Sequence, residues 1–154
     1  MQLKLFQFVL AIFIAAMGTQ KEMGSEKSEP LSYRLLKSSQ HQFGEIKAAN
    51  YDVSVDRFLN RQQIEKLICR VIGDENPTSL STLSISIFFK LDKMFATGGL
   101  RFLEKELLDR LISEYSWISS LPEKKNRLLI RRDAQGNVAG FQSFYDFDHT
   151  RDCK

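Results

Sequence analysis

The sequence predicts an α+β fold: a mostly antiparallel sheet of about five strands in the order ββαβαββ, with two amphipathic helices packed on one face. Residues 83–91 alternate apolar and polar side chains, the period of a strand with one buried face. Residues 64–72 repeat apolar side chains at helical spacing. The order of strands and helices shows no regular βαβ alternation, which favours α+β over a parallel α/β sheet.

The composition is that of one globular domain. The chain has 154 residues, of which 43% are hydrophobic and 27% charged, enough for a single core. Its formal net charge of +3 is too small to indicate a dedicated nucleic-acid partner.

The first segment, residues 1–18, has the form of an export signal. Its apolar run, residues 5–17, follows a lysine, and small residues favour cleavage after Gly18, with Ala16 as the second choice. The alternative is an uncleaved membrane anchor. A helix of this run would cover ~20 Å, short of the roughly 30 Å hydrocarbon core, so we expect an exported protein, periplasmic or extracellular.

The next elements are a linker and a hairpin. Residues 19–30 are polar and end in a proline, which is typical of a flexible linker, and residues 31–154 form the single domain. Alternating side chains predict strands over 31–35 and 45–55, joined through a polar turn at 37–42.

The first helix has sequence signals at both ends. Asn60 and Gln63 have the spacing of a capping box, and Gly73 stands where a left-handed C-cap is expected. Cys69 lies on the flank of the apolar stripe. That stripe consists of Ile64, Leu67, Ile68, Val71 and Ile72.

The remaining elements follow the alternating strand. Residues 93–99 are expected to form a flexible connection, and residues 100–112 a second amphipathic helix whose extension as far as Trp117 is left open. Residues 127–132 and 138–145 are expected to form a second hairpin around a turn that contains glycine and asparagine.

The two cysteines, Cys69 and Cys153, predict a disulfide. An even cysteine count in a chain sent to an oxidising compartment favours pairing. The alternative is a buried free thiol at residue 69 and a frayed tail at residue 153.

Candidate catalytic residues are few, because the common hydrolase, nucleotide-binding, zinc and calcium motifs are absent from the sequence. His41 lies in the predicted polar turn. Asp146, Asp148 and His149 crowd together near the C-terminus, where a carboxylate beside an imidazole is able to orient a general base or bind a divalent metal. The alternative is a turn whose side chains cap backbone groups, with Arg151 paired to an aspartate. We expect no metal and no cofactor.

A basic cluster and three aromatic residues are the other candidates. Lys124, Lys125, Arg127, Arg131 and Arg132 are expected to protect an edge strand from pairing, or to bind a polyanion.

The aromatic candidates are Phe88, Phe144 and Trp117. If their strands are neighbours, Phe88 and Phe144 form an exposed patch for a partner. The alternative is a second small core on that face, covered by the segment that carries Trp117 or by the N-terminal strand.

These observations favour a small exported protein that binds another protein or an envelope component and is not an enzyme. One alternative is a hydrolytic or metal-dependent enzyme that uses Asp146, Asp148 and His149. Another is a structural subunit tethered to the membrane through an uncleaved N-terminal segment, the one membrane contact that the sequence suggests.

Overall fold

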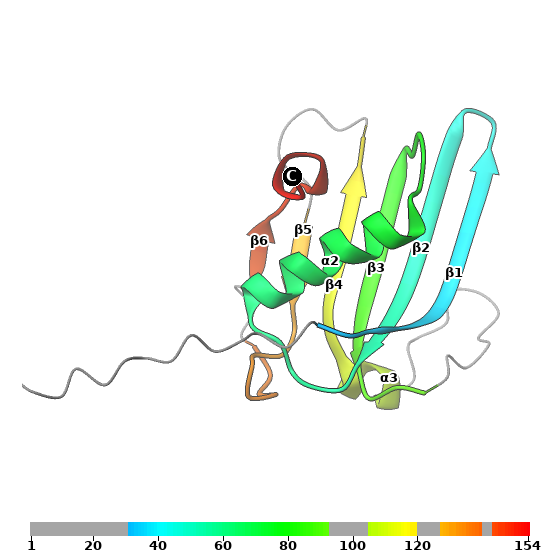
Figure 1. Ribbon diagram of the computed structural model, residues 1–154. Coiled ribbons are helices and arrows are strands. Elements are labelled where there is room, and N and C mark those ends of the chain that lie inside the picture. Colours follow the sequence, from blue (N-terminus) through cyan, green and yellow to red (C-terminus); the bar gives the residue numbers. More distant parts are fainter. Residues whose placement is uncertain (1–30, 93–104, 120–126, 140–142) are drawn as a thin grey trace, which may run out of the picture. The chain divides into compact units, whose positions relative to one another are not determined.

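Six strands form one mixed sheet in the order β1-β2-β3-β4-β5-β6 (Figure 1). The structure is a computed structural model that describes residues 31–92, 105–119, 127–139 and 143–154. The expected export signal, linker and flexible connection at 93–99 lie outside these residues. One pair, β2 with β3, is parallel and the other four pairs are antiparallel, so the α+β class and the mostly antiparallel sheet are confirmed.

The first hairpin is longer than the sequence pattern suggested. Strand β1 (Arg34–Phe43) pairs with β2 (Ile46–Val55), and Gly44 turns between them at a φ of 59°. The expected polar turn at 37–42 is therefore wrong, because these residues continue β1. They remain polar because β1 is the sheet edge and its side chains are largely exposed.

Helix α2 (Arg61–Glu75) carries the chain from β2 to β3 across one face of the sheet (Figure 1). The predicted capping box is present: the Asn60 side chain accepts from the backbone N–H of Gln63, whose side chain accepts from the backbone N–H of Asn60. The C-cap is Asn76, at a φ of 42°, and not Gly73, which lies inside the helix. The helix continues past Gly73 because Asn76 adopts the left-handed conformation instead.

Strand β3 (Thr82–Phe89) confirms the alternating pattern of residues 83–91. Leu83, Ile85 and Ile87 are buried against α2, and β3 lies inside the sheet between β2 and β4. The strand ends before Lys90, whose φ of 46° breaks the extended conformation.

The second helix expected over 100–112 ends at Arg110, and its possible extension as far as Trp117 is strand. Among the described residues, helix α3 covers Lys105–Arg110, and the chain then enters β4 (Leu111–Ile118), which pairs antiparallel with β3. The apolar spacing of 103–112 fits a helix locally, but from Leu111 onward pairing with β3 decides the conformation. This adds a sixth strand to the five expected.

The C-terminal hairpin is also rearranged. Strand β5 (Arg127–Ile130) pairs with β4 and with β6 (Phe144–Asp146), so β5 is an inner strand. The strand that carries the basic residues was expected at an edge of the sheet. That expectation is wrong, because β6 pairs with the outer side of β5. Between β5 and β6, an isolated bridge joins Arg132 to Val138. The chain ends in the short helix α4 (His149–Asp152).

Two hydrophobic clusters lie on opposite faces of the sheet. The main core packs the α2 stripe against inward side chains of β2 to β5, including Tyr51, Ile85 and Tyr115. A second, smaller cluster comprises Phe88, Leu91, Leu107 and Leu111. Because α3 contributes Leu107 to this second cluster, the two helices do not share one face as expected.

Within the described residues, no helix is long and apolar enough to cross a membrane.

Candidate functional site

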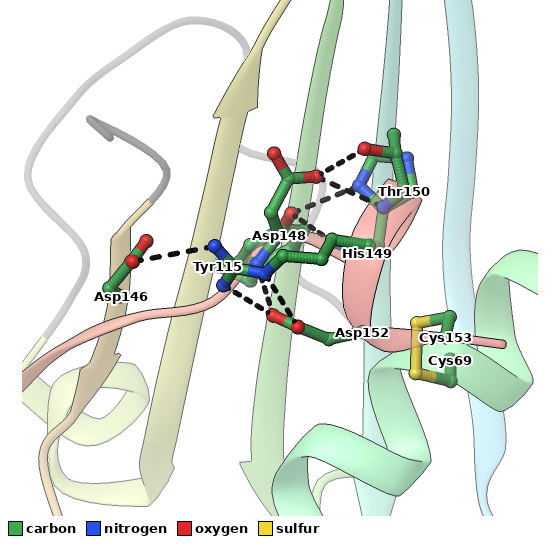
Figure 2. Close-up of polar contacts among 9 residues, drawn as sticks. Cys69, Tyr115, Asp146, Asp148, His149, Thr150, Asp152 and Cys153 are labelled. Carbon is green, nitrogen blue, oxygen red and sulfur yellow. Dashed lines mark hydrogen bonds and ion pairs between the residues drawn. A yellow bond between two sulfur atoms is a disulfide. The ribbon is translucent and has the colours of Figure 1, made fainter. Parts of the chain in front are cut away.

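The C-terminal turn, where the sequence crowds its ionisable residues, is held by a reciprocal cap (Figure 2). The Asp148 carboxylate accepts hydrogen bonds from the backbone N–H of Thr150 at 3.0 Å and from its hydroxyl at 2.7 Å. In return, the backbone N–H of Asp148 donates to the Asp152 carboxylate at 2.9 Å. The sequence folds locally into α4 because aspartate is a preferred N-cap residue.

Arg151 connects the two other aspartates. Its guanidinium meets both oxygens of Asp152, at 2.7 and 2.8 Å, and lies 3.6 Å from the Asp146 carboxylate. The hydrogen bonds from Arg151 lower the pKa of Asp152 to about 2. Arg151 therefore pairs with the carboxylates of both Asp146 and Asp152.

His149 packs against the side chains of β4. Its Nδ1 lies 3.0 Å from the Tyr115 hydroxyl, and its backbone N–H donates to the same oxygen at 3.2 Å. The imidazole also contacts Trp117, with ring centroids 4.9 Å apart. Burial lowers the pKa of His149, against the opposing charge of Asp148, and burial raises the pKa of Tyr115. The site favours a neutral imidazole beside a protonated phenol.

A disulfide joins Cys69 of α2 to Cys153, as the sequence predicted (Figure 2). The two Cα atoms are 5.2 Å apart although 84 residues separate them in the chain. The bond fixes the last residues of the chain to the flank of α2. Such a bond persists in a non-reducing environment.

A groove of about 840 Å³ runs between α2 and the C-terminal segment beside this disulfide. Arg61 pairs with Glu65 at 2.7 Å and lies over the Tyr145 ring, 4.3 Å from its centroid. His149 is not among the described residues that line the groove. The charged side chains of its walls include Arg61, Glu65, Lys66, Asp146, Arg151 and Asp152.

The three aromatic candidates do not share a surface. Phe88 is 1% exposed and belongs to the second cluster, Phe144 is 54% exposed on β6, and Trp117 is half-buried against the main core. Phe88 and Phe144 were expected together only if their strands were neighbours. They are separated because β4 and β5 lie between β3 and β6.

The basic cluster is divided among different partners. Arg131 pairs with Glu114 at 2.8 Å, and Arg132 donates to the backbone carbonyl of Gly136. Arg127 lies over the Phe144 ring, 5.9 Å from its centroid. Lys124 and Lys125 lie outside the described residues. His41 lies on the edge strand β1, and not in a turn, with its ring 6.2 Å from that of Phe43.

Sequence reasoning singled out His149 but missed its partner Tyr115. The helix expected over 100–112 was allowed to extend as far as Trp117. The alternation of Ser113, Tyr115 and Trp117, which marks the inward face of a strand, was therefore not recognised. Within the described residues, no group of three metal-ligating side chains is present.

No protein-family model, curated protein or solved structure gives a significant match to this chain. The functional conclusion therefore comes from the fold and from the contacts of the site.

Proposed function

We propose that this chain is an exported, non-enzymatic binding or accessory protein, and that the groove between α2 and the C-terminal segment is its binding surface. The observation that carries the proposal is the Cys69–Cys153 disulfide. It supports a destination outside the reducing cytosol. It also joins the two walls of the groove by a covalent bond, so the surface is partly ordered before a partner arrives.

The chemistry of the groove favours a charged, polar partner. Its volume is in the range of ligand sites, but those sites are mostly apolar, whereas both walls here carry charged side chains of either sign. A groove lined by both acidic and basic groups suits a complementary protein surface or a charged envelope component better than an apolar small molecule.

The contacts of the acidic turn favour binding over catalysis. Asp148 is engaged as the cap of α4, and Asp146 faces Arg151. The Nδ1 atom of His149 is occupied by Tyr115. A general base needs a lone pair directed at substrate, whereas the described contacts of these three groups hold the turn.

The test is affinity capture from the native source with the exported protein as bait, comparing two charge reversals. Lys66→Glu changes a wall of the groove, and Lys47→Glu changes an exposed lysine on β2 outside the groove. We expect the Lys66→Glu variant to lose a partner that the Lys47→Glu variant retains.

Equal capture by both variants would contradict the groove as the binding surface. Recovery of the native protein from the cytosol with two free thiols would contradict export. Mass spectrometry of the N-terminus of the native protein identifies whether the first segment has been removed.

A further inference from the structure

His149 lies at the junction between the C-terminal segment and the sheet. Tyr115 and Trp117 project from the same face of β4 and enclose the imidazole, with ring centroids 6.0 and 4.9 Å from that of His149. The ring is half-buried. These contacts attach α4 to β4, while the ion pair of Arg151 with Asp146 attaches it to β6.

The hydrogen bonds at this junction favour one tautomer of the neutral His149 ring. The Tyr115 oxygen accepts from the backbone N–H of His149, so the single phenolic proton is available to donate to Nδ1, 3.0 Å away. Nδ1 is then the acceptor and carries no proton, which places the proton of the neutral ring on Nε2. A second proton on Nδ1 turns this acceptor into a donor, so the hydroxyl of Tyr115, which is 1% exposed, must turn its own proton away from the ring and loses its buried acceptor.

The charged groups around the ring do not provide a new partner for an imidazolium. On its own segment, Asp148 caps α4, and Asp152 is held by Arg151. On β4, the titratable group that faces the ring is the phenol of Tyr115. On α2, across the groove, Arg61 pairs with Glu65, while Lys66 adds positive charge. The cost of burying a charged ring therefore exceeds the attraction of Asp148 for that charge. The pKa of His149 is lowered as a result.

We propose that protonation of His149 releases α4 from β4, while the disulfide keeps the segment tethered to α2. The disulfide to α2 is insensitive to acid in this range, and the exposed ion pair of Arg151 with Asp146 holds α4 to β6, whereas the hydrogen bond from Tyr115 on β4 needs a neutral ring. Because Arg151 and Asp152 of α4 line the groove, its shape becomes dependent on pH. The consequence for binding rests on the proposed function, whereas the release itself does not.

The only tryptophan in the sequence, Trp117, reports this step directly. An imidazolium in contact with an indole quenches its fluorescence, and departure of the ring changes the solvent exposure of the indole. We expect the fluorescence of the intact protein to change with a midpoint below 6.5, the ordinary histidine value. His149→Gln should abolish the transition. His41→Gln, which changes the other histidine of the chain, should leave it intact.

Hydrogen exchange measures the release itself. The backbone N–H groups of Arg151 and Asp152 donate to the Asp148 carbonyl, and that of Cys153 donates to the His149 carbonyl. Between about pH 7.5 and pH 5, where histidine titrates, their protection should fall by about tenfold after correction for the intrinsic rate. Tyr115→Phe should give the low protection already at neutral pH, and the protection of β3 should not change.

Three results would overturn the proposal. A fluorescence transition that persists in His149→Gln would assign it to another group. A midpoint above 6.5 would show that the indole stabilises the imidazolium by a cation–π contact. Unchanged protection of α4 at low pH would show that the ring titrates in place. None of these results depends on a partner, so failure of the groove as a binding surface remains a separate outcome.

Discussion

Leu111 and Ile112 are neighbours in the chain and both are buried, yet they belong to different hydrophobic clusters. Leu111 packs with Phe88 in the smaller cluster, whereas Ile112 packs in the main core under α2. The pairing of β4 with β3 is irregular here, because Leu111 pairs with Phe88 and Ser113 with Ile87, which leaves Ile112 as an extra residue. The bulge allows Ile112 to face the same core as Tyr115 while Leu111 faces the other side of the sheet. The sheet is therefore apolar on both faces at this end, and each face has a consequence for stability that can be measured.

The second cluster predicts a large effect at Phe88. Phe88→Ala should lower the free energy of unfolding by about 3 to 5 kcal/mol, because it opens a cavity among Leu91, Leu107 and Leu111. The matched control is Phe144→Ala, which removes a ring that is 54% exposed and should change stability by less than about 0.5 kcal/mol. Urea unfolding of both variants makes the comparison. Similar losses for the two would contradict the different environments of the two rings.

The disulfide predicts a stability loss on reduction. Replacing Cys69 and Cys153 together by serine should lower the unfolding free energy by about 4 kcal/mol, because a bond across 84 residues restricts the unfolded chain. Denaturant unfolding of the oxidised protein and of the double variant gives the difference. Thiol titration of the native protein under denaturing conditions should find no free thiol before reduction and two after it. Free thiols in the unreduced protein would refute the pairing.

The cap of α2 predicts a smaller and purely local effect. Asn60→Ala removes the acceptor for the backbone N–H of Gln63 and should cost about 1 kcal/mol. Gln62→Ala changes an exposed position in the first turn and serves as the control, with little expected change. Thermal unfolding followed by circular dichroism distinguishes the two. Equal stability of both variants would argue against the capping box.

Asp52 predicts that stability falls as the pH rises. Burial between β1 and β3 raises the pKa of this carboxyl, against the hydrogen bond from Ser86 and the charge of Lys37. The folded protein therefore binds this proton more tightly than the unfolded chain does, and its contribution to stability is present at low pH and lost as the pH rises through the folded pKa. Asp52→Asn should be more stable than the wild type at pH 7, and this advantage should shrink toward the ordinary aspartate pKa of 3.8.

Asp133 provides the comparison of opposite sign. Backbone N–H groups of Gln135 and Asn137 donate to its carboxylate at 2.9 and 2.8 Å, and they lower its pKa. Its stabilising contribution is therefore present above pH 3.8 and is lost as the pH falls. Asp133→Asn should be less stable than the wild type at pH 7. If both aspartate variants change stability in the same direction across the pH range, at least one of the two pKa shifts is assigned wrongly.

The candidate site could be anticipated only in part from the sequence. The pairing of Cys69 with Cys153 followed from the cysteine count and the expected compartment, and the crowding of ionisable groups drew attention to His149. Its partners Tyr115 and Trp117 were not anticipated, because contacts between distant residues, 34 positions apart for Tyr115 and His149, depend on which strand lies beside the C-terminal segment. The separation of Phe88 from Phe144 likewise depends on strand order.

The sequence by itself determined α2 with its capping box and apolar stripe, and β3 with its buried face. Their signals are local: a polar cap at a fixed spacing and a period that matches one conformation only. Tertiary structure decided the conformation of Leu111–Ile118, whose first residues suit a helix by spacing and become a strand by pairing with β3. It also decided that β1 is an edge and β5 is not, because strand order follows from hydrogen bonds between distant segments, which leave no local pattern in the chain.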